Sequence, residues 1–206
     1  MVDFNDLDLG YEQVVGIHSY ITNEGESLAT RINGNIDKLT NDWVAEDATL
    51  HINNIIDVYN KLVKFIKASV AVLADATEKI IQVQETRESN GATSSMVGGK
   101  VSREVDLTGD KAEITKSVKY TTEVSILRAD FEELNNLTEE FKIFSERVEK
   151  EGDDLMQNWL AGNGRTETKE ELESFKTVSK ESHVKMTEAC EKLELAVNNI
   201  ENISKA

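Results

Sequence analysis

Apolar residues recur every three to four positions through four long stretches of the chain, with polar and charged residues between them. This spacing places the apolar side chains along one face of an α-helix. It predicts helices over residues 11–39, 49–87, 122–157 and 168–203. The chain contains no proline, the residue that breaks a helix by removing a backbone donor, so helices of this length can run uninterrupted. The fold class that follows is all-α.

The first and second pairs of predicted helices carry the same pattern. The two tryptophans of the chain, Trp43 and Trp159, are 116 positions apart (159 − 43), and each follows the first helix of its pair. At this offset the apolar positions around each tryptophan coincide in helical phase. Examples are Val15 with Phe131, Ile21 with Leu137, Leu28 with Phe144, Ile32 with Val148 and Leu39 with Leu155. We therefore interpret the chain as two copies of one helix–turn–helix unit.

Each unit is predicted to be an antiparallel helical hairpin, because a short turn between two long helices makes them neighbours. Residues 1–88 would form the first hairpin and residues 120–206 the second. Trp43 and Trp159 would each fill the space where two helix ends meet. We expect the two hairpins to pair within the chain as a four-helix bundle, which would leave the protein a monomer.

Residues 89–119 interrupt the helical pattern. They begin with glycine, serine and asparagine, and then apolar and polar residues alternate on both sides of Gly109-Asp110. A Gly-Asp pair suits a two-residue turn between antiparallel strands. The segment is therefore predicted to be a small β-hairpin connector lying on the helices, since an isolated two-stranded ribbon is marginal in water. The facing pairs would be Leu107–Ala112, Val105–Ile114 and Val101–Val118.

The charge and the hydropathy of the chain exclude some classes of binding partner. The formal net charge of −16 argues against nucleic acid, whose phosphates need clustered Lys and Arg. The longest apolar run, residues 70–74, is far shorter than the ~20 residues that cross a bilayer, so no stable membrane insertion is expected. The first residues have neither a basic start nor an apolar run, and no cleaved signal peptide is expected.

No catalytic, metal or cofactor site is expected. The three histidines, His18, His51 and His183, are scattered, and His18 lies on an inner helical stripe where a hydrogen-bonded core residue is expected. No glycine-rich phosphate loop follows a strand. Cys190 is the single cysteine, which excludes an internal disulfide and favours a small buried thiol. The sequence therefore predicts a protein that is not an enzyme.

The two turns carry the motifs Trp43-Val44-Ala45 and Trp159-Leu160-Ala161. Paired helical hairpins with such turns resemble the tryptophan-x-glycine (WxG) family of type VII secretion, with Ala45 and Ala161 standing in place of its glycine. Members of that family are small acidic helical hairpins that pair into four-helix dimers. They are exported without a cleaved signal peptide or serve as secretion partners for toxins.

The resemblance implies a non-enzymatic interaction protein, either an exported effector or a secretion partner and chaperone for a toxin. Its partner would be the secretion machinery or a co-secreted toxin. It would be secreted without a cleaved signal peptide, or cytoplasmic before export. Two alternatives are a helical pore-forming toxin component, in which long helices join a β-hairpin tongue, and a cytoplasmic coiled-coil scaffold. The charged residues of the predicted hairpin, such as Arg103 and Glu104, disfavour the tongue.

Apolar residues outside the inner stripes are the candidates for partner binding. The alternative is that they widen the core. The β-branched cluster on the second helix makes the first hairpin the preferred surface. The candidates there are Val14, Ile56, Val63, Ile81 and Val83, and those of the second hairpin are Ile126, Ile143, Leu195 and Val197.

Overall fold

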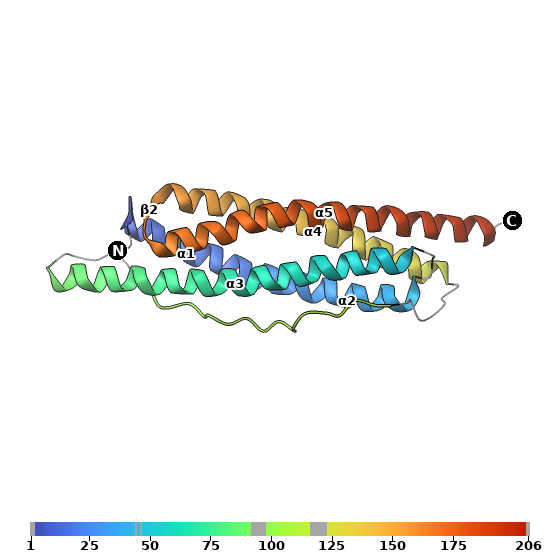
Figure 1. Ribbon diagram of the computed structural model, residues 1–206, viewed down its shortest axis with the longest axis horizontal. Coiled ribbons are helices and arrows are strands. Elements are labelled where there is room, and N and C mark those ends of the chain that lie inside the picture. Colours follow the sequence, from blue (N-terminus) through green and yellow to red (C-terminus); the bar gives the residue numbers. More distant parts are fainter. Residues whose placement is uncertain (1–2, 44, 46, 92–97, 116–122, 205–206) are drawn as a thin grey trace. The chain divides into compact units, whose positions relative to one another are not determined.

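The computed structural model describes residues 3–43, 45, 47–91, 98–115 and 123–204, and this part of the chain is predominantly helical (Figure 1). The prediction of an all-α chain is confirmed at this level, with a small two-stranded antiparallel sheet added. The elements in chain order are β1 (Asp3–Phe4), α1 (Leu7–Tyr20), the π-helical turn η1 (Ile21–Gly25), α2 (Glu26–Asp42), α3 (Ala48–Ser89), α4 (Val124–Asn158), β2 (Trp159–Ala161) and α5 (Asn163–Ser204).

Two helix starts differ from the predicted ones. The first helix begins at Leu7, because the side chain of Asp6 accepts a hydrogen bond from the backbone N–H of Leu9 at 3.0 Å and caps the helix there. The last helix begins at Asn163 and not near Thr168, which is buried within α5. The spacing of the apolar residues predicted the presence of these helices correctly. It did not predict where they begin, because that depends on local polar contacts.

Contacts divide the chain into two compact units, each assembled from three separate stretches. Unit 1 comprises Met1–Glu26, Lys64–Asp106 and Phe144–Thr177. Unit 2 comprises Ser27–Val63, Leu107–Ile143 and Val178–Ala206. The helices α3, α4 and α5 each contribute a segment to both units, so this division cuts across the predicted hairpin domains.

The core of unit 1 contains a chain of aromatic rings. Tyr20 of α1 stacks on Phe144 of α4, with ring centroids 5.5 Å apart. Phe144 meets Phe175 of α5 edge to face at 6.0 Å, and Phe175 stacks on Phe65 of α3 at 3.6 Å. Such pairs add to the stabilisation from burial alone. Helical segments from both predicted hairpins therefore share one core in this unit.

Unit 2 also joins segments of both predicted hairpins. Its centre is built of aliphatic side chains from α2, α3, α4 and α5 that are fully buried, among them Leu39, Ile52, Ile55, Leu134 and Leu193. Polar contacts cross between the same helices. Lys185 of α5 bonds to Asp57 of α3 at 2.6 Å, and Arg31 of α2 pairs with Glu140 of α4.

The assignment of segments to units follows a rule. Unit 2 contains the turn of the first hairpin, around Trp43, together with the beginning of α4 and the end of α5. Unit 1 contains the turn of the second hairpin, around Trp159, together with α1 and the end of α3. Each unit therefore combines the turn of one hairpin with the open end of the other.

The prediction of a β-hairpin in the connector is wrong for the part that the structure describes. Residues 98–115 form no strand, and in Figure 1 this segment, in green, carries no strand arrow. The two-stranded sheet instead pairs β1 with β2, with Phe4 opposite Trp159. Val118, predicted to face Val101, lies outside the described residues. We call residues 98–115 the strap.

The strap fails to pair with itself because helix side chains satisfy its backbone. In unit 1, the Tyr11 hydroxyl donates to the carbonyl of Gly99 at 2.7 Å, and His18 Nε2 lies 2.8 Å from the carbonyl oxygen of Ser102. These bonds supply partners that a β-ladder would otherwise provide. The predicted hydrogen-bonded core role of His18 is confirmed, since its side chain is buried.

Candidate functional site

Trp43 closes the turn between α2 and α3. Its side chain is 1% exposed, and its ring stacks on that of His51 with centroids 5.8 Å apart. Its backbone N–H donates to the carbonyl of Leu39 at 2.9 Å, which extends the hydrogen-bonding of α2 to the turn. His51 lies in the first turn of α3, so the stacked rings tie the end of one helix to the start of the next. Ala45, two residues on, is half-buried.

Trp159 closes the second turn and is 0% exposed. Its ring stacks on Phe4 with centroids 4.9 Å apart and planes 19° from parallel, while its Nε1–H donates to the carbonyl of Ala161 at 3.2 Å. The guanidinium of Arg165, in the first turn of α5, donates to the carbonyl of Trp159. Ala161 itself is exposed. Both tryptophans are thus buried in turns, where the sequence placed them.

The second turn has a partner that sequence reasoning missed, the N-terminal segment. The carboxamide of Asn158 accepts from the backbone N–H of Asp6 at 3.0 Å and donates to the carbonyl of the same residue at 3.0 Å. The backbone N–H of Asn5 donates to the carbonyl of Asn158 at 2.9 Å. The only signal in the sequence was an isolated Phe4 ahead of the helix-capping Asp6.

The candidate partner-binding residues of the first hairpin are not an exposed surface. Val14, Ile56 and Val63 are fully buried, and Ile81 and Val83 are half-buried. The prediction of an uncovered face is therefore wrong for the first three.

In the second hairpin Ile143 is 60% exposed and Leu195 56% exposed, and Ile126 is also exposed, whereas Val197 is buried. Exposed apolar side chains of the candidate set thus lie on α4 and α5.

In unit 1 the strap lies against the helix face that carries Val14. Tyr11 and His18, which bond to the strap, are three and four positions from Val14 on α1. Residues with these separations share a helix face. Val14 is 0% exposed and shares this face with the buried His18, so it belongs to the core of unit 1, as in the alternative that the candidates widen the core. Sequence reasoning missed the strap that bonds to the same face.

In unit 2 the same relationship recurs on α3. The carboxamide of Asn60 donates to the carbonyl of Lys111 at 2.9 Å and accepts from its N–H at 2.8 Å. The carboxamide of Asn53 makes the same two bonds to Ile114, at 3.0 and 2.9 Å. Ile56 and Val63 each follow one of these asparagines by three positions, so the buried candidates alternate with the residues that bind the strap.

Lys111 adds a side-chain contact to the strap in unit 2. Its Nζ lies 2.8 Å from Asn33 Oδ1 and 2.6 Å from Asp37 Oδ1, both on α2. The Tyr59 hydroxyl on α3 lies 2.6 Å from the hydroxyl of Thr108. We call the residues of α2 and α3 that contact the strap here, namely Asn33, Asp37, Asn53, Tyr59 and Asn60, the clamp site.

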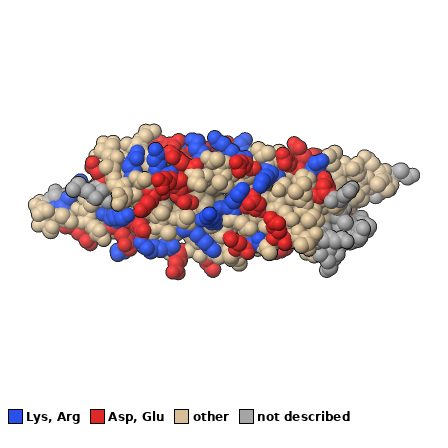
Figure 2. Space-filling view, in the orientation of Figure 1, with Lys and Arg blue, Asp and Glu red and all other residues tan. Residues whose placement is uncertain are grey.

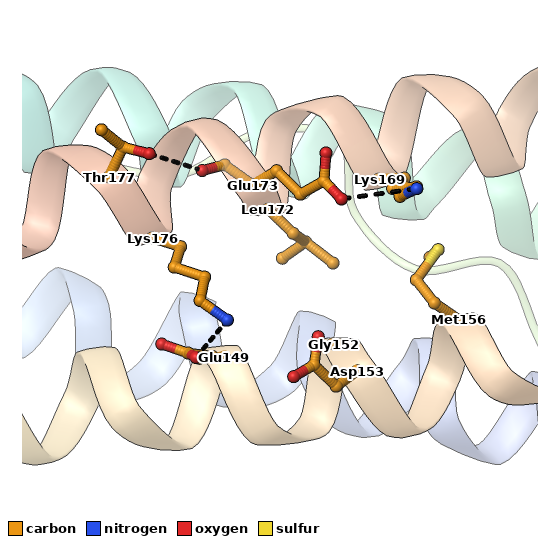
Figure 3. Close-up of a pocket in the computed structure, with 9 residues that line it drawn as sticks. All are labelled: Glu149, Gly152, Asp153, Met156, Lys169, Leu172, Glu173, Lys176 and Thr177. Carbon is orange, nitrogen blue, oxygen red and sulfur yellow. Dashed lines mark hydrogen bonds and ion pairs between the residues drawn. The ribbon is translucent and has the colours of Figure 1, made fainter.

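A pocket of about 390 Å³ lies between α4 and α5 in unit 1 (Figure 3). It opens beside Gly152, where a β-carbon would come within 2.9 Å of Leu172 Cδ1. Its rim carries charged groups that pair with one another, Lys176 with Glu149 and Lys169 with Glu173 (Figure 3). A rim of paired charges around a small apolar floor offers no arrangement of acid, base and nucleophile.

Two buried groups have shifted pKa values, and neither belongs to a catalytic arrangement. Burial, followed by the nearby Asp42 carboxylate, raises the pKa of Asp130 to about 6, against the opposing effect of Lys38. Burial raises the pKa of the Cys190 thiol, whose sulfur lies 3.4 Å from the Thr138 hydroxyl. A buried thiol with a raised pKa is a poor nucleophile.

Among the residues that the structure describes, no cluster of three or more His, Cys, Asp or Glu side chains could hold a metal ion. No helix in this part of the chain combines the length and apolar character needed to cross a membrane. On the face shown in Figure 2, basic side chains are interspersed with acidic ones.

A comparison with models of known protein families, with curated proteins and with solved structures finds no match. The resemblance to WxG proteins therefore rests on the sequence alone, on the two tryptophan turns and the helical patterns that flank them.

Proposed function

We propose that this chain is a non-enzymatic interaction protein of the type VII secretion kind. Two WxG-like hairpins would pair in one chain as a four-helix bundle, and the protein would be exported or would escort a co-secreted partner. The chain would then supply, within a single polypeptide, the arrangement that the WxG family is expected to make from two chains.

The observation that supports this proposal most is the composition of the two compact units. Each combines the tryptophan turn of one hairpin with the open end of the other. Antiparallel pairing of two hairpins produces this combination, whereas parallel pairing would bring the two turns into one unit. The burial of both tryptophans fits the same role, because each fills the end of a helical layer.

The pore-forming alternative depends on a β-hairpin tongue, and the strap is a poor candidate for one. Its backbone is bonded to side chains of α1 and α3. Two of its basic side chains also pair with the helices, Arg103 with Asp75 and Lys100 with Glu78. Moving such a segment into lipid would require breaking these polar contacts and burying the charges.

Export from a bacterium that has a type VII system tests the proposal. The tagged chain would be expressed in a parent strain and in one lacking the membrane ATPase of that system. We expect the chain, or a protein that co-precipitates with it, to appear in the medium only when the ATPase is present. Equal amounts in both media, for the chain and for its co-precipitating proteins, would count against the proposal. A cytosolic marker enzyme controls for lysis.

A further inference from the structure

The clamp site recognises an extended backbone, because each asparagine pairs with both the N–H and the C=O of one residue. Asn53 binds Ile114 in this way, and Asn60 binds Lys111. Seven residues of α-helix rise about 10.5 Å, and three residues of extended chain span about 10 Å. The two carboxamides are therefore spaced to read positions three apart on an extended segment that runs opposite to α3.

Side-chain recognition is confined to a few positions of the strap. The ammonium of Lys111 is held by Asn33 and Asp37, and Lys111 and Ile114 are half-buried. Ala112 and Glu113, which lie between them, are exposed. The site thus selects a lysine followed three positions later by an apolar residue, and it places no demand on the two side chains between.

From this geometry we infer that the clamp site binds an extended Lys-x-x-apolar segment of another protein, and that residues 107–115 occupy it as a built-in competitor. Each bond that the strap loses on leaving is one that an incoming segment makes again with the same group. The exchange is therefore decided by additional contacts that the partner makes, such as burial against the helix face near Ile56 and Val63. The apparent affinity for the partner segment is lowered, because the segment can bind only to the fraction of molecules in which the strap has left the site.

The partner chemistry comes from the occupant seen in the site, and it is complementary in charge. The acidic Asp37 faces the lysine of the segment, so the charge complementarity lies at this one side chain. This inference is independent of the secretion proposal, because it depends on α2, α3 and the strap alone. A failed export experiment would leave it standing, and its own failure would leave the hairpin pairing untouched.

Peptide binding to the full chain tests the inference. The probe is a fluorescent synthetic peptide with the sequence of residues 104–115, and its control peptide carries glutamate in place of the lysine. The protein is used as wild type and as an opened variant, Lys111→Ala with Ile114→Ala. In the opened variant, Asn53→Ala and Asn60→Ala remove the clamps, and Asn54→Ala on the neighbouring position of α3 is the matched control.

We expect the opened variant to bind the peptide at least about tenfold more tightly than wild type, because the competitor is weakened. Each clamp substitution should weaken binding about tenfold, as the loss of two hydrogen bonds implies. Asn54→Ala should change little, and the glutamate peptide should not bind. An opened variant that keeps its helical circular dichroism but does not bind, or that binds equally well without both clamps, would overturn the inference.

A second measurement applies even if the opened variant does not fold. In the wild-type chain, the amides of Lys111 and Ile114 should exchange with deuterium well before those in the buried middle of α3, because the strap opens locally. Exchange of these amides only with global unfolding would overturn the inference. So would an opened variant that forms dimers by light scattering and ignores the peptide, since a second copy would then be the occupant.

Discussion

Phe4 and Trp159 stack ring on ring although they are 155 positions apart in the sequence (159 − 4). The centroid distance is 4.9 Å, and β1 and β2 pair at the same place. The second tryptophan turn is therefore completed by the N-terminal segment, whereas the first is completed by His51 of the helix that follows it. This difference leads to a prediction for each turn.

Removing either tryptophan should destabilise the protein strongly. Trp43→Ala and Trp159→Ala should each lower the free energy of unfolding by about 3–5 kcal/mol, because each leaves a large cavity. Urea denaturation followed by circular dichroism measures the change. A loss below about 1 kcal/mol at both positions would show that the rings are not core residues.

Phe4→Ala should affect the turn around Trp159 and not the turn around Trp43. It removes the stacking partner of Trp159, and we expect a loss of about 1–3 kcal/mol with a red shift in the fluorescence of that tryptophan. In a Trp43→Phe background, Trp159 is the single reporter. An unchanged emission maximum would contradict the contact. The matched change His51→Ala, in a Trp159→Phe background, reports on Trp43 in the same way.

Two helix glycines should respond in opposite directions to alanine. At Gly34 nothing lies within 4 Å of an added β-carbon, and Gly34→Ala should stabilise the protein by about 0.5–1 kcal/mol through helix propensity. At Gly25 the added carbon would lie 3.0 Å from Ile66 Cδ1 and 3.3 Å from Phe144 Cζ. Gly25→Ala should therefore give a lower melting temperature than Gly34→Ala. The reverse order in thermal melts would mean that the helices do not approach closely at Gly25.

Asp130→Asn should stabilise the protein at neutral pH. Its pKa in the folded state is about 6, above the ordinary 3.8, so the folded protein disfavours the ionised form. The contribution of Asp130 to stability is fully present below pH 3.8, falls as the pH rises towards 6, and stays low above that. The variant should gain about 1–2 kcal/mol at pH 7, and the gain should vanish near pH 4.

Urea titrations at several pH values measure this difference. Asp154→Asn, a change at an exposed carboxylate, is the control for loss of a charge. A gain from Asp130→Asn that is the same at pH 4 and pH 7 would contradict the proposed ionisation.

The two hairpins should depend on each other. Light scattering of the full chain at low micromolar concentration should give a monomer near 23.0 kDa. Residues 1–90 alone should be poorly helical or self-associated, because α1 and α3 would expose apolar faces that α4 and α5 cover. A stable, fully helical monomer of residues 1–90 would contradict intramolecular pairing.

The helices and the tryptophan turns could be predicted from the sequence, because both depend on local pattern. The structure of the strap could not. The alternation of Val105, Leu107 and Ile114 suits a β-ribbon and equally suits an extended segment lying against helices. The deciding groups, Asn53 and Asn60, are polar residues of a helix far along the chain.

The candidate surface failed for a related reason. Val14, Ile56 and Val63 were placed outside the inner stripe, but the structure buries them completely. The periodicity of a single helix does not show how wide its buried face becomes when several helices pack around it. The contact between Phe4 and Trp159 was invisible too, because it joins segments with no shared pattern.

The match between seven helical residues and three extended residues also constrains how this chain could change over time. Substitutions at Ala112 and Glu113 should be tolerated freely, since the asparagines read only backbone. Inserting or deleting one residue between Lys111 and Ile114 would change their separation, so that only one of the two carboxamides could keep its pair of bonds. In related chains, length variation should therefore fall outside this interval, while the identity of the residues within it drifts.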